Sequence, residues 1–85
     1  MELKDTVKLM ISADYKERFR AEYWQTRIRY EKLHKIIREY CYGTLSFTPD
    51  SPIKLLREQC EAMLAYLAAL EKRAKIEGID LEEKL

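Results

Sequence analysis

Glycine and proline are scarce in this 85-residue sequence, which holds two of each. That scarcity leaves little material for the turns of a β-sandwich, a barrel or a repeat array. Charge of one sign is also missing, because 16 Lys and Arg residues offset 15 Asp and Glu residues to a net charge of +1. General basicity is therefore excluded as a means of binding long nucleic acid. No run of residues approaches the roughly 18 apolar positions of a membrane-spanning helix.

Cysteine is scarce as well, and two cysteines are too few for a secreted disulfide scaffold. The first eleven residues do not have the pattern of a signal peptide, because Lys4 and Lys8 interrupt their apolar part and no small-residue cleavage site follows. We therefore expect a cytoplasmic protein with free thiols, made of one small domain over residues 1–85.

Apolar spacing predicts a first long helix over residues 13–42. Its mainly apolar positions recur every three or four residues and so form one stripe along a face of an α-helix. Ser12 is expected to be the N-cap, and Gly43 to end the helix in the left-handed conformation. The members of the stripe are Tyr15, Phe19, Tyr23, Thr26, Tyr30, Leu33, Ile37 and Tyr40.

A second helix is predicted over residues 52–77, after a loop at 43–51 in which Leu45 and Phe47 are expected to pack. Ser51 is the expected N-cap, and Gly78 the expected terminator with Ile79 folding back in the Schellman manner. The second stripe consists of Ile53, Leu56, Cys60, Met63, Leu67, Leu70 and Ala74.

The two stripes match in length and predict an all-α fold, an antiparallel two-helix hairpin. The segment from residue 6 to 11 is expected to form a short N-terminal helix or arm over one end. A hairpin buries only the contact between its two stripes, yet further apolar residues lie off both stripes. We therefore expect a second copy of the chain to cover them in a helical-bundle homo-oligomer. These off-stripe residues are Trp24, Ile28, Ile36, Leu55, Leu64, Ala65 and Ala68.

Catalysis and metal binding have little support in the sequence. His34 has no nucleophile three or four residues away, and the serines fit caps and loops, so we expect a protein that is not an enzyme and carries no cofactor. His34, Cys41 and Cys60 resemble a zinc set in type, but their spacing matches no ligand pair. We expect no metal and two buried free thiols.

Basic and aromatic residues alternate in the first half of the first helix. Guanidinium groups suit phosphate oxygens and flat rings suit bases, so this segment is a candidate nucleotide site. The alternative is a solvated face whose arginines only pair with Glu17, Glu22 and Glu31. The candidate ligand-binding residues are Lys16, Arg20, Tyr23, Trp24, Arg27 and Tyr30.

The segments DYKERFRAEY (14–23), RYEKL (29–33), LSFTP (45–49), SPIKLL (51–56) and QCEAMLAYLAALEKR (59–73) resemble a family of small helical proteins of phages and prophages, the crAss-like-phage-related small proteins. Small phage proteins of this kind include oligomeric sponges that sequester cyclic nucleotides. The resemblance implies a non-enzymatic immune-evasion protein, of anti-CBASS type, that binds a cyclic di- or trinucleotide in the cytoplasm of an infected bacterium. Two alternatives remain open at this point: an anti-CRISPR-like inhibitor that binds a host protein complex, and a small phage structural or assembly factor.

Overall fold

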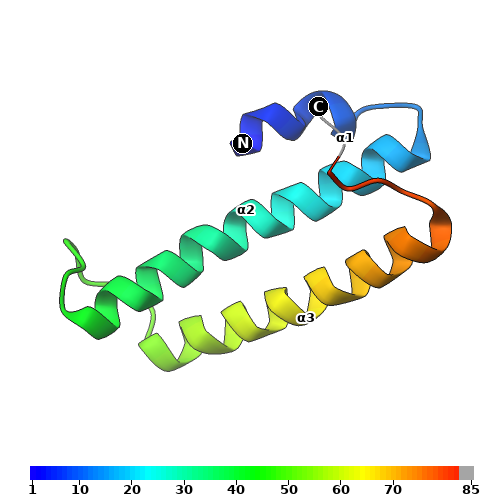
Figure 1. Ribbon diagram of the computed structural model, residues 1–85. Coiled ribbons are helices and arrows are strands. Elements are labelled where there is room, and N and C mark those ends of the chain that lie inside the picture. The colour runs from blue at the N-terminus through cyan, green and yellow to red at the C-terminus, as the bar shows by residue number, and fades with distance from the viewer. Residues whose placement is uncertain (83–85) are drawn as a thin grey trace.

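The computed structural model of the chain describes residues 1–82 (Figure 1). Within this range the chain forms the 3-10 helix η1 (Leu3–Thr6) and the α-helices α1 (Val7–Met10), α2 (Tyr15–Tyr42) and α3 (Ile53–Glu77), and no strand. The antiparallel pairing of α2 with α3 confirms the all-α hairpin. No helix of the described part is long and apolar enough to cross a membrane.

Helix α2 begins at a different cap from the expected one. The N-cap is Asp14, whose side chain accepts a hydrogen bond from the backbone N–H of Lys16 at 2.9 Å. The prediction of Ser12 was wrong, because its hydroxyl bonds to the backbone N–H of Asp14 and to Glu17 instead, each at 3.0 Å. The other end is as expected, since Gly43 closes the helix with a left-handed φ of 73°.

Helix α3 begins with Pro52 in the N-cap position, where the prediction had Ser51. Pro52 lacks an N–H group and has an extended ψ of 144°, so it starts the helix without a side-chain cap. At the other end Gly78 adopts a left-handed φ of 70°. The backbone N–H of Ile79 then bonds to the carbonyl of Ala74 at 2.9 Å, which confirms the expected Schellman closure.

The core is concentrated where the start of α2 meets the end of α3. Trp24, Tyr30 and Leu81 pack against its edge. The stripe residues nearer the loop, such as Leu33, Ile37 and Met63, are only half-buried. The hairpin is therefore tightly closed at one end and looser at the other. The core cluster is formed by Phe19, Tyr23, Leu67, Leu70, Ala74 and Ile79.

A polar clamp holds the closed end. The hydroxyl of Tyr15 donates to Glu77 at 2.7 Å and accepts from Arg73 at 2.8 Å. The Arg73 guanidinium also lies 5.0 Å from the centre of the Phe19 ring. The hydrogen bond from Tyr15, and then that from Arg73, lowers the pKa of Glu77. The clamp thus ties the first turn of α2 to the last turn of α3.

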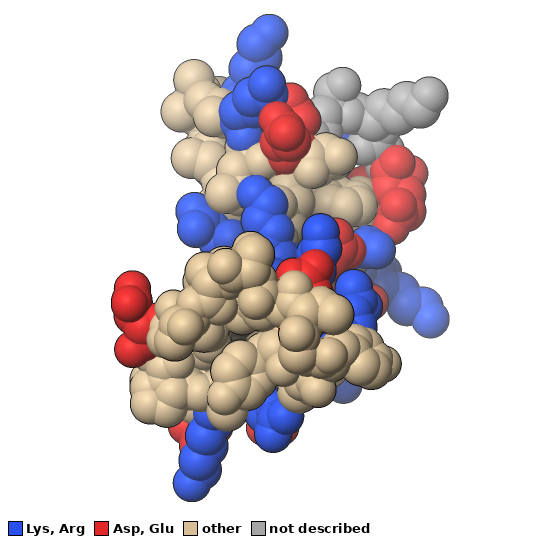
Figure 2. Space-filling view, turned by 90° about the vertical axis from the view of Figure 1, so that its left-hand side faces the viewer, with Lys and Arg blue, Asp and Glu red and all other residues tan. Residues whose placement is uncertain are grey.

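The loop end is open by comparison. Leu45 is half-buried, but Phe47 is 54% exposed, so the prediction that both pack under the loop was wrong for Phe47. Tyr40 and Tyr42 are also exposed there. Figure 2, which looks onto this end, shows uncharged side chains gathered over the loop.

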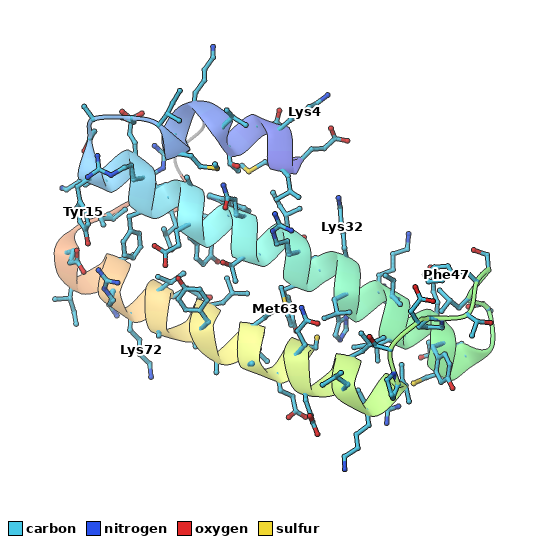
Figure 3. All side chains as sticks on the ribbon, turned by 180° about the vertical axis from the view of Figure 1, so that it is seen from behind. Lys4, Tyr15, Lys32, Phe47, Met63 and Lys72 are labelled. Carbon is cyan, nitrogen blue, oxygen red and sulfur yellow. The ribbon has the colours of Figure 1, made fainter. Side chains whose placement is uncertain are left out.

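The N-terminal segment (η1 and α1) packs on α2 along the side away from α3 (Figures 1 and 3). Thr6 is fully buried, and its hydroxyl accepts a hydrogen bond from Gln25 at 3.2 Å. Ala21 and Ile28 share this face of α2 with Gln25 and are buried too. The expectation that a second copy covers Ile28 was therefore wrong, because the chain's own first ten residues do so.

Replacing Ile28 with Ala is expected to lower the free energy of unfolding by about 2–5 kcal/mol, since it empties a buried site between α2 and the N-terminal segment. Ile76→Ala is the matched control, because Ile76 is 85% exposed on α3 and its loss is expected to change stability by less than about 0.5 kcal/mol. Urea unfolding of both variants measures the difference. Equal stability of the two variants would show that the N-terminal segment does not cover Ile28 in solution.

Candidate ligand-binding groove

Two neighbouring cavities lie along the contact between α2 and α3. Tyr30 and Leu64 line both, so the cavities are neighbours, and together they are called here the α2–α3 groove. The larger cavity, about 340 Å³, is lined by Tyr23, Arg27, Tyr30, Glu31, Leu64, Leu67, Glu71 and Glu82. The smaller, about 260 Å³, is lined by Tyr30, His34, Ile37, Arg57, Cys60, Glu61 and Leu64.

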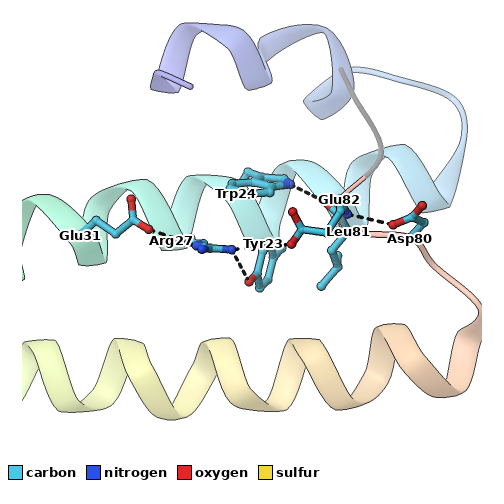
Figure 4. A network of polar contacts seen from close by, with 7 residues as sticks. All are labelled: Tyr23, Trp24, Arg27, Glu31, Asp80, Leu81 and Glu82. Carbon is cyan, nitrogen blue, oxygen red and sulfur yellow. Dashed lines mark hydrogen bonds and ion pairs between the residues drawn. The ribbon is translucent and has the colours of Figure 1, made fainter.

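Arg27 is the cation among the lining residues of the larger cavity, and Figure 4 shows its polar contacts. Its Nε donates to Glu31 at 3.1 Å and its Nη1 donates to Tyr23 Oη at 3.2 Å. Its guanidinium carbon lies 4.9 Å from the centre of the Trp24 ring. Partial burial lowers the pKa of Arg27, but the hydrogen bonds to Glu31 and Tyr23 raise it overall. The charge is therefore retained and held in one place.

Aromatic rings surround this guanidinium. Tyr23 and Trp24 meet edge to face, with ring centres 5.4 Å apart and planes at 86°. Burial raises the pKa of Tyr23, which keeps the hydroxyl protonated. One turn further along α2, Tyr30 stacks with His34 at 5.7 Å and an interplanar angle of 29°. The groove thus offers flat ring surfaces beside a fixed positive charge.

Four of the six candidate residues come together at this place. Tyr23, Arg27 and Tyr30 line the groove, and Trp24 stacks on Arg27 behind it. The Arg27–Glu31 ion pair is one that the solvated-face alternative expected, so Arg27 has both an internal partner and an open side.

The other two candidate residues lie outside the groove lining. Arg20 is only 6% exposed, so its guanidinium is withdrawn from the surface. Lys16 is exposed in the first turn of α2. Of the three basic candidates, Arg27 is therefore the one that lines the groove of a single chain.

The larger cavity also carries more negative than positive charge. Arg27 faces Glu31, Glu71 and Glu82 on its walls. A bare anion gains from the guanidinium but is repelled by the carboxylates. A ligand that also donates hydrogen bonds, through hydroxyl or amino groups, satisfies both kinds of wall.

Several groove residues were not among the sequence candidates. Leu64 was assigned to a subunit seam and His34 was given no role, although His34 lies one helical turn from the candidate Tyr30. Arg57 comes from α3 and donates to the Cys41 sulfur at 3.0 Å. Glu82 follows the last apolar stripe, where periodicity carries no signal. The four-residue spacing from Tyr30 is therefore the signal that could have found His34, whereas Leu64 is brought to the groove by the packing of α3 on α2.

The two cysteines differ in environment. Both are free thiols, Cys60 buried and Cys41 exposed, so the expectation of two buried thiols was wrong for Cys41. Cys41 sits near the C-terminal end of α2, in the loosely packed part of the hairpin. Across residues 1–82 no three His, Cys, Asp or Glu side chains are grouped so that they could hold a metal ion.

Thiol alkylation at neutral pH is expected to modify Cys41 and spare Cys60. Burial raises the pKa of Cys60 and so reduces its reactive thiolate, whereas Cys41 is open to solvent beside a guanidinium. Mass spectrometry after brief iodoacetamide treatment locates the adduct. The Cys41→Ser variant is expected to stay unmodified until urea unfolds it, and rapid labelling of Cys60 in the folded variant would contradict the buried placement.

Comparison with known proteins gives one family match. The model of the Sequestin family matches residues 13–76, which is about three quarters of the chain and includes α2, the loop and nearly all of α3. No curated protein and no solved structure matches the chain significantly. Because the matched region contains nearly the whole hairpin and most of the groove lining, the chain belongs to the Sequestin family.

Proposed function

We propose that this protein binds a small nucleotide in the α2–α3 groove and sequesters it without chemical change. The class we name is the cyclic oligonucleotide signal, a cyclic di- or trinucleotide. The observation that carries the proposal is the Arg27 guanidinium, held 4.9 Å from the Trp24 ring centre and facing a cavity of about 340 Å³.

A nucleotide matches each wall of the groove. Its phosphate suits the guanidinium of Arg27, and its base suits stacking on the Tyr30–His34 pair. The carboxylates of Glu31 and Glu71 accept hydrogen bonds from ribose hydroxyls and from the amino groups of bases. A bare phosphate satisfies only the first of these groups, so the mixed charge of the groove favours a complete nucleotide.

The family name supports sequestration as the activity, and the likeness to small phage proteins supports a role in immune evasion. A sponge requires only tight binding, so it needs no nucleophile or general base in the groove. We propose that the protein acts in the cytoplasm of an infected bacterium, where it lowers the concentration of a defence signal.

Thermal unfolding with a panel of cyclic di- and trinucleotides tests the proposal. A ligand present at about 100 times its dissociation constant is expected to add about 2.7 kcal/mol of stability, which raises the melting temperature by roughly 10–20 °C in a domain of this size. Arg27→Met is expected to remove most of that rise, because it keeps the apolar stem and loses the charge.

Arg29→Met is the matched control, since Arg29 is exposed on α2 and lies outside the groove lining. It is expected to keep the full rise in melting temperature. Absence of a shift with every nucleotide in the panel would contradict the cyclic oligonucleotide assignment. An equal loss in both arginine variants would contradict the role of Arg27.

We further propose that the chain forms a homo-oligomer through α3. The folded chain exposes 6268 Å², whereas a compact monomer of its mass exposes about 5,300 Å². Much of the exposed side of α3 is apolar, with Leu64 at 53% exposure beside Ala65 and Ala68. The small side chains allow a second helix to approach closely, and Leu64 lies on the rim of the groove.

Light scattering at micromolar concentration is expected to give a mass above the 10.2 kDa of one chain. Ala65→Arg is expected to reduce the mass to that of a monomer, because the exposed position tolerates the long side chain within one chain but not against a second helix. Ala13→Arg, at an exposed position before α2, is the control that leaves the mass unchanged. A wild-type mass of one chain would contradict the proposal.

A further inference from the structure

The chain continues past α3 into a short C-terminal turn, residues 79–82, that folds back toward α2 (Figures 1 and 4). Ile79 is buried in the core and Leu81 packs against it. The backbone N–H of Glu82 donates to the Asp80 carboxylate at 3.0 Å. The turn is therefore anchored by apolar contacts and closed by its own hydrogen bond.

This anchored turn brings two acceptors to the aromatic–arginine cluster. The carbonyl of Leu81 accepts from the indole Nε1 of Trp24 at 2.8 Å. A carboxylate oxygen of Glu82 lies 3.9 Å from Nη1 of Arg27. Glu82 also lines the larger cavity, so the chain itself places an anionic group where Arg27 faces the groove.

We propose that Glu82 is a gatekeeper that occupies, in the free protein, the position on Arg27 that an anionic group of the ligand takes. This inference rests on the proposed function of the groove. The ligand displaces the Glu82 side chain, while Leu81 stays bound to Trp24 and keeps the turn in place.

The strengths of the contacts support the proposal that the Glu82 side chain is displaced while Leu81 stays bound. The Glu82 side chain is 76% exposed and its ion pair is long, so the contact is weak and easily exchanged. Leu81 combines apolar packing with a short hydrogen bond and is not displaced by charge. Because the turn tethers the carboxylate beside Arg27, its effective concentration there is high. A small free anion competes poorly with it, whereas a ligand that also stacks and donates hydrogen bonds competes well.

The test compares Glu82→Gln with Glu71→Gln in the full-length protein. Both variants remove one negative charge from the same cavity, but of these two carboxylates it is Glu82 that forms an ion pair with Arg27. Isothermal titration with a cyclic dinucleotide and, in parallel, with inorganic pyrophosphate gives the affinities. Glu82→Gln is expected to raise both affinities about two- to five-fold, the range that an exposed ion pair supports, and Glu71→Gln to raise them less.

A second measurement checks the anchor. The indole N–H resonance of Trp24, which is the only tryptophan in the sequence, is expected to stay protected from hydrogen exchange in Glu82→Gln, with or without ligand. Loss of that protection on binding would overturn the part of the proposal in which Leu81 stays in place.

The outcomes separate the gatekeeper from the proposed function. Tighter pyrophosphate binding in Glu82→Gln than in Glu71→Gln, with no nucleotide bound by any form, supports the gatekeeper and contradicts the nucleotide proposal. Nucleotide binding of equal strength in the wild type and both variants supports the groove and overturns the gatekeeper. Equal gains in the two variants also overturn it, because a general charge effect then explains the change. Failure of both probes to bind overturns both proposals.

Discussion

Helix α2 lies between α3 and the N-terminal segment and must bury two opposite faces. The rest of the structure depends on this constraint. Tyr23 and Phe19 face α3, whereas Ala21 and Ile28 face the N-terminal segment. Side chains at the boundary between these faces are neither fully buried nor free. Trp24 and Arg27 occupy that boundary: Trp24 packs against the core and bonds to Leu81, whereas the Arg27 guanidinium lies by the Trp24 ring and also lines the groove.

The two-sided burial also explains why packing is uneven along the hairpin. The N-terminal segment and the C-terminal turn both gather at the start of α2, where the core cluster and the Tyr15–Glu77–Arg73 clamp lie. Nothing comparable supports the loop end in residues 1–82, and most stripe residues there, such as Leu33, Ile37 and Met63, stay half-buried. The α2–α3 groove extends from the closed region into the open one. The proposed ligand would therefore contact well-packed groups at Arg27 and less tightly packed ones toward His34.

Much of the fold could be predicted from the sequence because its elements are long and local. Helical periodicity and the two glycines that end the helices need no knowledge of the partner surface. The caps were less predictable, since Ser12 and Asp14 are both good N-caps and only the path of the preceding chain decides between them. The cover of Ile28 was not predictable either. An apolar residue off the main stripe signals a contact but does not say whether the same chain or another copy provides it.

The charge around the candidate site was also not predictable from the sequence. The sequence made both Arg20 and Arg27 candidate ligand-binding residues, but the fold buries Arg20 and places Arg27 beside carboxylates that come from α3 and the C-terminal turn. The charge of a groove is a sum over elements that only the tertiary structure brings together. That sum also makes chemical sense of a sponge. A purely basic groove would bind any anion, whereas Arg27 and Arg57 set among carboxylates and rings are expected to favour, over a simple phosphate, the proposed ligand, whose hydroxyl, amino, ring and phosphate groups match the groove together.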